Sequence, residues 1–466
     1  MYRAHPEKRH EAIQTKTTLD QLAPQDHLVR KLDRHIDFSI VHRLCAPLYS
    51  NTGTPGIDPE IIIKIILLGP LFNIRSVRQT VKEVQTNLAY RWFLGLGIDE
   101  KVPDHSTISQ AYRRCFHDND VFQKIFEDIV RQAEAHGFIS GRILVTDSTH
   151  IRANANKRKF DKVEVERVVG EIEEELLPRV NEERAERGKK PLKPKGAGKE
   201  RRLVKVSRTD PEAGYMYRDQ KPEGFFWLAH RTVDAKHNFI VDVHVTPGNV
   251  SDSTVYLDRI THILDRFGFP LEAVALDAGY YTTEIAKALT ERGIFAVIAR
   301  RRFGGKKGMF RKTRYTYVPE EDVYICPARQ RLTYQTTDRH GYHHYVSDPA
   351  ICRNCPLLAK CTSSKSHRRD ITRHIDESYR EAVNANRLSA SGQYLYRLRP
   401  QTVERSFADG KELHGLRFTF YRGIKKVQRA NLVEATAQNM KKLANLLARK
   451  DCLHSISSIL WGQNAS

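Results

Sequence analysis

The sequence predicts a mixed α/β domain that follows a helical N-terminal region. Short β-prone, apolar-rich segments typical of strands occur at residues 143–145, 225–245, 273–276 and 295–298. The segment 225–245 alternates around a central turn and therefore predicts a hairpin. Helical patterns separate the later segments, so the order is strand, hairpin, helix, strand, helix, strand. This order predicts a mixed sheet with helices packed on it.

The composition indicates a polyanionic partner. The chain has 466 residues, with 77 Lys and Arg against 56 Asp and Glu, which gives a net charge of +21. Nucleic acid is the commonest partner of so basic a protein, although a ribosome-associated basic protein has the same composition. The N-terminus lacks the apolar core of a signal peptide, and the longest apolar run, residues 61–72, is interrupted by Lys64. We therefore expect a cytoplasmic protein with no membrane partner.

Residues 1–136 form the predicted helical N-terminal domain, and DNA binding is its expected role. Asp58 can cap a helix that has Pro59 in its first turn, and the run IIIKIILL that follows is apolar on nearly all sides. This pattern predicts a buried helix. Basic side chains on the neighbouring helices fit a DNA-binding module, but a solvated face explains each of them as well.

The expected catalytic domain spans residues 137–450, and two segments of unlike composition interrupt it. The first, 157–215, contains a stretch of Glu and Arg at helical spacing (164–187) and then a Lys-, Gly- and Pro-rich run (189–202). We interpret these as a charged helix and a flexible basic linker. The second, 300–390, holds a basic loop and a cysteine cluster. Residues 451–466 form a tail.

Two aspartates follow short apolar strands in the same manner. Asp147 comes after the strand predicted at 143–145, and Asp277 comes after the strand at 273–276. An unpaired buried charge costs several kcal/mol, and ligands gather at the carboxyl ends of strands. The two side chains can therefore share a Mg²⁺ ion if their strands are neighbours. Asp277 precedes Ala-Gly and could instead cap a turn. Either Ser251 or Asp252 could cap the helix after the hairpin.

A glutamate in the C-terminal part is the candidate third carboxylate. Glu404 and Lys411 are seven residues apart and share one face of a predicted helix. Phe407 lies on the adjoining apolar edge, which can pack on the sheet. Asp409 and Glu412 are rivals by proximity, but they point elsewhere on this helix.

Four cysteines fall in the second inserted segment. They include a Cys-x-x-Cys pair, and such a pair with two further thiolates is typical of a tetrahedral structural Zn²⁺ site; the four are Cys326, Cys352, Cys355 and Cys361. Unligated thiols in a reducing compartment are the alternative, because seven cysteines in a chain without a secretion signal argue against disulfides.

The densest positive run of the chain precedes these cysteines. Glycines separate its members, so we expect a mobile loop that follows a phosphate backbone by salt-sensitive contacts; the run includes Arg300, Arg301, Arg302, Lys306 and Lys307. A solvated surface loop is the alternative.

Three blocks of the sequence together resemble those of the DDE transposases of bacterial insertion sequences, in the group whose catalytic helix carries Tyr, Arg, Glu and Lys. The blocks are VTDSTHIRANANK, then VTPGNVSD with ALDAGYYT, then YRLRPQTVERSFADGK. The stretches SVRQTVKEVQTNLAYRWFLGL and VPDHSTIS resemble the domain that precedes the catalytic one in that family. One spacing departs from the signature, since four residues separate Arg399 from Glu404 where the family has three.

The resemblance implies an RNase H-like catalytic domain in which Asp147, Asp277 and Glu404 hold two Mg²⁺ or Mn²⁺ ions. It also implies DNA contacts near the active site from Tyr396, Arg399 and Lys411. The expected reaction is hydrolysis at the element ends, followed by attack of the freed 3′-hydroxyl on target DNA. The expected partners are double-stranded DNA, as terminal inverted repeats and target, and further copies of the chain on the DNA ends, in association with the nucleoid.

Two other functions fit the same residues. A metal-dependent nuclease of the same fold would cleave DNA without joining it. A relative that has lost catalysis would only bind DNA, although the presence of all three carboxylates argues against that alternative.

Overall fold

The computed structural model describes residues 18–49, 56–116, 119–169, 171–194, 198–217, 223–300 and 308–462. Helices form the chain up to residue 135 and enclose the apolar helix α4 (Pro59–Leu71). The α4 N-terminus is as the sequence predicts, since the Asp58 carboxylate accepts a hydrogen bond from the Glu60 amide at 2.7 Å. The other helices of this part are α1 (Leu19–Leu22), α2 (Leu28–His35), α3 (Ser39–Cys45), α5 (Val77–Thr86), α6 (Leu88–Phe93), α7 (His105–Ala111) and α8 (Val121–Ala135).

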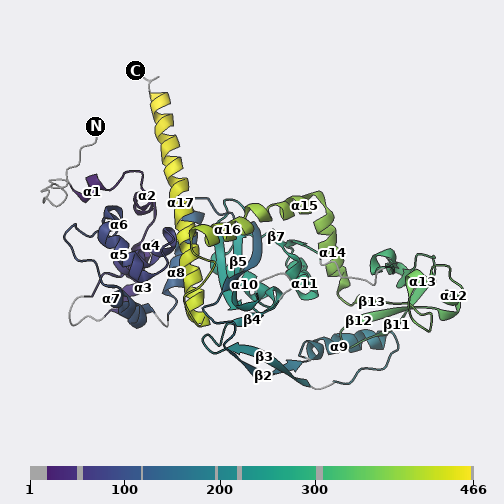
Figure 1. Cartoon of the computed structure of the whole chain (residues 1–466). Helices are drawn as coiled ribbons and strands as arrows, with labels where there is room; N and C mark the ends of the chain where they lie inside the picture. The colour runs from purple at the N-terminus through teal and green to yellow at the C-terminus, as the bar shows by residue number, and fades with distance from the viewer. Residues whose placement is uncertain are drawn as a thin grey trace, which may run out of the picture.

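One long C-terminal helix joins these helices to the rest of the chain. Helix α17 (Ile424–Gly462) contacts α2, α4 and α8 on the N-terminal side and β6 on the other. Figure 1 shows α17 standing between the N-terminal helices and the sheet. It continues through the segment that the sequence assigns to a tail.

The central sheet is mixed, with antiparallel and parallel strand pairs. Strand β5 (Gly224–Asp234) pairs antiparallel with β1 (Ile143–Arg152) on one side and with β6 (Ile240–Pro247) as a hairpin. On the far side of β1, the sheet continues with two strands parallel to it, β7 (Ala273–Leu276) and β8 (Phe295–Ile298). The short strand β4 (Gly214–Met216) extends the start of β5. Every residue of β5 is buried, as expected for a strand covered on both faces.

Helices from several parts of the chain cover this sheet. Helix α10 (Asp252–Phe267) follows the β5–β6 hairpin, and α11 (Thr283–Glu291) connects β7 to β8. Helix α16 (Val403–Leu413) packs on β1 and β5, while α15 (Ala390–Arg397) packs on β7 and β8. The strands and helices therefore follow each other in the order that the sequence predicts.

The first inserted segment differs from its prediction. Strands β2 (Phe160–Val169) and β3 (Gly198–Ser207) form a two-stranded antiparallel ribbon, and α9 (Glu171–Glu186) lies between them in the chain. The helix predicted from residue 164 and the linker predicted to residue 202 were therefore wrong in part. Valines alternate with charged residues on β2, and cross-strand pairs such as Val163 with Val204 and Glu166 with Arg201 favour the ribbon.

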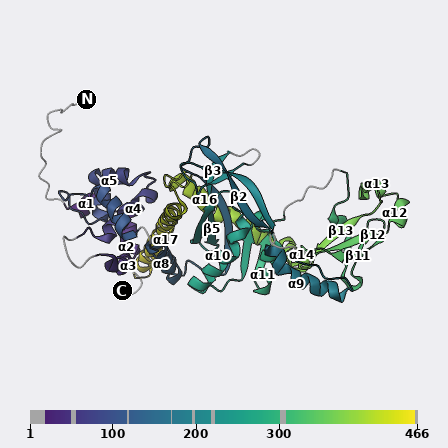
Figure 2. The ribbon, with the colours of Figure 1, turned by 90° about the horizontal axis from the view of Figure 1, so that it is seen from below.

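The second inserted segment builds a small antiparallel sheet with its own aromatic core. Its strands are β9 (Thr316–Val318), β10 (Val323–Ile325), β11 (Arg331–Thr337), β12 (Tyr342–Ser347) and β13 (Asp370–His374). Helices α12 (Pro349–Arg353) and α13 (Leu358–Cys361) lie between β12 and β13, and α14 (Glu377–Leu388) leads back to the catalytic sheet. Figures 1 and 2 both place this small sheet on the side of the molecule away from the N-terminal helices.

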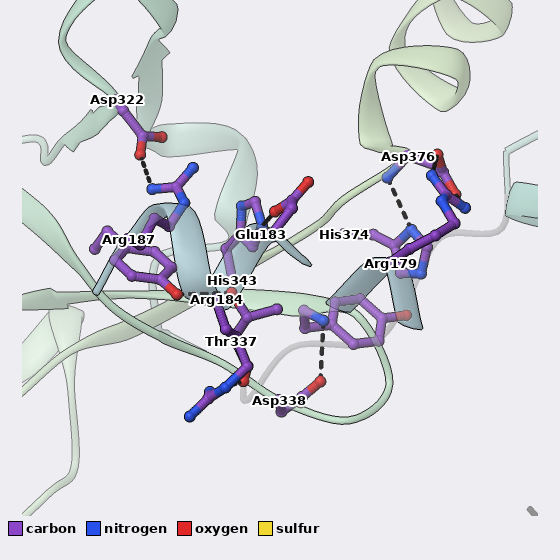
Figure 3. A network of polar contacts seen from close by, with 12 residues as sticks. Arg179, Glu183, Arg184, Arg187, Asp322, Thr337, Asp338, His343, His374 and Asp376 are labelled. Atoms are coloured by element: carbon purple, nitrogen blue, oxygen red, sulfur yellow. Dashed lines mark hydrogen bonds and ion pairs between the residues drawn. The ribbon is translucent and has the colours of Figure 1, made fainter. Parts of the chain in front are cut away.

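Helix α9 connects the two inserted segments by charged contacts (Figure 3). Arg179 forms a bidentate ion pair with Asp376, with N–O distances of 3.0 and 2.7 Å. Glu183 contacts His343, and Arg187 pairs with Asp322. Segments separated in sequence by the strands β5 to β8 thus form one lobe, which the sequence did not predict.

Candidate active site

Asp147 lies in the interior of β1, not at its end as predicted. The two short β-prone pieces around it form one strand of ten residues, because the whole of it pairs with β5. The neighbouring strand β7 is shorter, however, and its last pair joins Leu276 to Thr146. Asp147 directly follows Thr146 within β1, and Asp277 directly follows Leu276, the last residue of β7. The parallel register therefore sets these aspartates side by side at the point where β7 ends.

Burial gives the Asp147 carboxyl an unusual protonation equilibrium. Desolvation raises the pKa of Asp147 to about 6, against the opposing effect of the Arg399 guanidinium. The negative charges of Asp277 and Asp252 raise it further. A site of this kind favours a positive charge beside the carboxylate.

Arg399 supplies that positive charge and lies between two of the predicted ligands. Its Nη2 donates to Asp147 Oδ2 at 2.6 Å, and its Nε is 3.9 Å from Glu404 Oε1. Arg399 is only 4% exposed, whereas the Glu404 side chain, in the first turn of α16, is half-exposed. A short 3₁₀ turn, Arg399–Gln401, precedes α16 within the interval that is one residue longer than in the family signature.

The two other residues of the signature lie near these groups. Lys411 is seven residues after Glu404 and lies on the same face of α16. Its Nζ donates a hydrogen bond to the Thr149 hydroxyl of β1 at 2.6 Å. The Tyr396 ring lies 5.6 Å from the guanidinium carbon of Arg399. The structure thus places Tyr396 beside Arg399, and Lys411 beside a residue two positions along β1 from Asp147.

Asp277 has the capping role that the sequence left open as well as its place beside Asp147. Its Oδ1 accepts a hydrogen bond from the Gly279 amide at 2.5 Å. A Cβ on Gly279 would lie 2.8 Å from Asp277 Oδ1 and 3.2 Å from Asp252 Oδ2. The glycine therefore leaves room for two carboxylates to approach each other.

Asp252 is a fourth carboxylate of this site, which sequence reasoning treated only as a helix cap. It is the first residue of α10, and its Oδ1 lies 3.7 Å from Nδ1 of the buried His230. The signal that could have identified it is its place at the end of the block VTPGNVSD.

The chemistry of the donors fits a divalent cation, but their arrangement is not that of a closed metal site. Carboxylate oxygens are the ligands that Mg²⁺ and Mn²⁺ prefer, and a cation would compensate the buried charge at Asp147. Among the residues that the structure describes, no group of three or more His, Cys, Asp or Glu side chains is placed to hold a metal ion. Arg399 lies between Asp147 and Glu404 instead.

The four predicted zinc ligands line one small cavity in the second inserted segment. Cys326, Cys352, Cys355 and Cys361 all contribute to its wall. The Cys361 thiol is 3.0 Å from the Tyr315 hydroxyl, and burial raises the pKa of Cys361. Among the described residues these thiols do not form a metal-binding group either. The structure therefore brings the four cysteines together at one cavity without arranging them as a tetrahedral set.

Most of the predicted basic loop lies outside the described residues. Arg300 is exposed at the end of the segment after β8. Arg301, Arg302, Lys306 and Lys307 lie outside the described residues.

The mixed sheet sets two aspartates side by side where β7 ends, and paired carboxylates of this kind suit a divalent cation and phosphoryl transfer. Two family models match the chain: a transposase domain (DUF772) over residues 17–114 and a transposase DDE domain over residues 325–444. The chain is a DDE transposase of the insertion-sequence type, an enzyme that acts on DNA. The second match includes Glu404, while Asp147 and Asp277 lie between the two matches.

Solved structures give weaker likenesses. The piggyBac transposase synaptic complex with hairpin DNA is 10% identical, with a TM-score of 0.32, over 90% of this chain and 78% of that chain. The Mos1 transposase paired-end complex with the left transposon end is also 10% identical, with a TM-score of 0.16, over 54% of this chain and 62% of that chain. No curated protein matches the chain.

Membership of the DDE family implies dependence on a divalent metal ion. Within the described residues, no helix is both long and apolar enough to cross a membrane.

Proposed function

We propose that this transposase cleaves DNA at the ends of its insertion sequence and joins the freed 3′-hydroxyl to target DNA. Asp147, Asp277 and Glu404 are the proposed metal-binding triad. The observation that supports the proposal best is the β1–β7 register, which sets Asp147 beside Asp277 in a sheet covered by the Glu404 helix.

Two Mg²⁺ or Mn²⁺ ions bound by these carboxylates would activate the attacking oxygen and stabilise the leaving oxygen. The residues of the chain supply the positioning. Asp147 is on a strand paired on both sides, and Asp277 is fixed by its hydrogen bond to the Gly279 amide, so both carboxylates have a defined place before DNA binds. Glu404 is on a separate helix and half-exposed, which leaves it free to complete the site from the other side.

Charged groups around the triad would hold the DNA backbone. The Arg399 guanidinium presents a planar fork that matches a phosphate, and Lys411 and Tyr396 lie near it. The run Arg300–Arg302 with Lys306 and Lys307 would add contacts that depend on salt. Terminal inverted repeats and target duplex are the proposed partners, bound by an oligomer of this chain, with the helical residues 1–136 as a second DNA-binding region.

We also propose that Cys326, Cys352, Cys355 and Cys361 bind a structural Zn²⁺. Support comes from the Cys-x-x-Cys spacing and from the single cavity that the four thiols line. Four thiolates leave no open coordination position, so the ion would stabilise the small sheet and take no part in catalysis. Metal analysis of the purified protein should find one zinc per chain, and its absence would refute the proposal.

One reaction mixture tests the function. Purified protein is incubated with labelled element-end DNA, a target plasmid and Mg²⁺ or Mn²⁺. Joined products are expected; cleavage without joining would favour a nuclease, and binding alone would favour a catalytically silent relative. Asp147→Ala, Asp277→Ala and Glu404→Ala should each abolish cleavage. Asp409→Ala, on the same helix as Glu404, is the matched control and should retain it.

A further inference from the structure

A short aromatic segment follows the Glu404 helix directly and carries two large exposed rings. We call residues 417–422, with the sequence RFTFYR, the aromatic segment. Phe420 is 55% exposed and Tyr421 is 45% exposed. Apolar rings on a surface favour a binding partner, because their exposure to water is unfavourable.

The aromatic segment is fixed to the end of the strand that carries Asp147. The Arg152 amide of β1 donates to the Arg417 carbonyl at 3.2 Å, and the Thr419 amide donates back to the Arg152 carbonyl at 3.1 Å. Beyond the strand, the Asn154 side chain donates to the Phe420 carbonyl at 2.8 Å. The exposed rings therefore have a defined position relative to the active-site strand.

Basic hollows border the aromatic segment on both sides. One hollow lies between Phe418 and the loop of residues 152–158, where Arg152, Lys157 and Arg158 are exposed. Its lining residues include no carboxylate.

The other hollow lies between the aromatic segment and the N-terminal helices, with Arg75 and Lys426 in its wall. The one carboxylate in its lining, Glu434, is buried and paired with Arg231. Both hollows are thus positively charged where they face solvent. The charge of Arg417 is compensated by its ion pair with Glu412, so the positive charge of the hollows comes from the other basic side chains.

We propose that the aromatic segment binds unpaired nucleotides of a DNA single strand, whose bases stack on Phe420 and Tyr421 while their phosphates lie along the basic hollows. Rings flanked by cations are how proteins bind single strands without reading sequence. Duplex DNA presents phosphates but keeps its base faces stacked, so it would use the cations without the rings. This inference rests on the proposed function, in that DNA is the substrate.

Binding of tailed and blunt DNA tests the proposal in the absence of cleavage. Full-length protein carrying Asp147→Ala is titrated with a fluorescent duplex that ends in a short oligothymidine tail, and with the same duplex made blunt. Phe420→Ala and Tyr421→Ala should each weaken binding to the tailed duplex by roughly tenfold or more, and should leave binding to the blunt duplex unchanged. A 2-aminopurine in the tail should lose fluorescence on binding, and each alanine variant should reduce that quenching.

Matched variants separate stacking from general surface effects. Phe420→Trp keeps a ring and should retain tail binding, whereas Phe420→Leu keeps apolar area without a ring and should lose it. Tyr394→Ala removes a tyrosine that is 58% exposed on α15 and should change nothing. Both rings are exposed, so the urea unfolding midpoint should stay constant.

Three results would overturn the inference. Equal losses for tailed and blunt duplex would make the rings part of general DNA binding. Unchanged tail binding in both alanine variants would exclude stacking. A shift in oligomeric state on sedimentation of the DNA-free variants, with tail binding intact, would assign the rings to a protein partner. Cleavage is measured separately with the unmodified active site, so failure of the proposed transposition reaction would be distinguished from each of these.

Discussion

The buried arginine behind the active site gives a prediction with a defined magnitude. Arg231 on β5 stands opposite Asp147 in the strand register and is 1% exposed. Its guanidinium pairs with Glu434 of α17 and donates to the carbonyl and hydroxyl oxygens of Ser406 on α16, at 3.1 and 2.8 Å. One side chain thereby connects the central sheet, the Glu404 helix and the long C-terminal helix.

Replacing Arg231 with methionine would leave Glu434 as an uncompensated buried charge. Loss of one partner from such a pair costs about 3–5 kcal/mol, whereas replacement of both partners by apolar residues is often close to neutral. We therefore expect Arg231→Met to lower the free energy of unfolding by about 3–5 kcal/mol. The double variant Arg231→Met with Glu434→Leu should recover most of this loss.

Urea unfolding followed by the fluorescence of Trp227 measures both effects. Trp227 is fully buried on β5, so its emission reports on the catalytic sheet. Trp92 and Trp461 are replaced by phenylalanine in all samples to isolate this signal. A loss below about 1 kcal/mol in Arg231→Met, or a double variant no more stable than the single one, would refute the reasoning. DNA cleavage should fall in the single variant because α16 loses its anchor on β5.

Three further predictions concern other sites. Gly279→Ala should abolish cleavage with little change in global stability, because a Cβ would press on the Asp277 carboxylate. Gly268→Ala, at the C-terminus of α10 where a Cβ meets open space, is the control: its positive φ should cost stability but not catalysis. Equal cleavage activities of the two variants would contradict the prediction. Burial alone would raise the pKa of Asp376, but its ion pair with Arg179 outweighs burial and lowers that pKa. The pair therefore stabilises α9 above the ordinary pKa of 3.8 and is lost as the pH falls below it, so amide exchange of α9 should accelerate in acid, and Arg179→Ala should show fast exchange already at neutral pH. Burial lowers the pKa of Lys442 to about 8 from 10.5. Between pH 8 and 10.5 the unfolded chain therefore binds more protons than the folded one, so the free energy of unfolding should rise with pH across this range. Lys442→Met should remove that rise, as measured by urea midpoints.

The sequence predicts the sheet because its strands are defined by local patterns. The strands at 273–276 and 295–298 are short apolar runs, and the structure has strands at the same residues. The continuation of β1 past Asp147 could not be predicted in this way, because Thr149 and Ile151 are held in the strand by pairs with β5, more than seventy residues away. The neighbouring places of Asp147 and Asp277 likewise depend on a pairing register that no local pattern contains.

The inserted segments show where composition misleads. Glu and Arg at helical spacing also occupy the solvent faces of a ribbon, and the valines at 163 and 165, in alternation with charges, were the contrary signal. The docking of α9 depends on His343 and Asp376, which lie far along the chain. Long-range ion pairs of this kind leave no trace in the residues near the helix itself.

Arg399 joins the sequence signature to the electrostatics of the site. The signature assigns this residue to DNA, while the structure places its guanidinium against Asp147 and toward Glu404. The two roles are compatible, because a cluster of carboxylates beside a buried strand needs a positive charge whether or not a metal ion is bound. In the structure the Arg399 guanidinium compensates the charge of Asp147. A divalent cation held by the carboxylates would supply that positive charge instead, and the guanidinium would then be available to a DNA phosphate. The short turn Arg399–Gln401 precedes the Glu404 helix, and the single Arg399 side chain lies near both carboxylates.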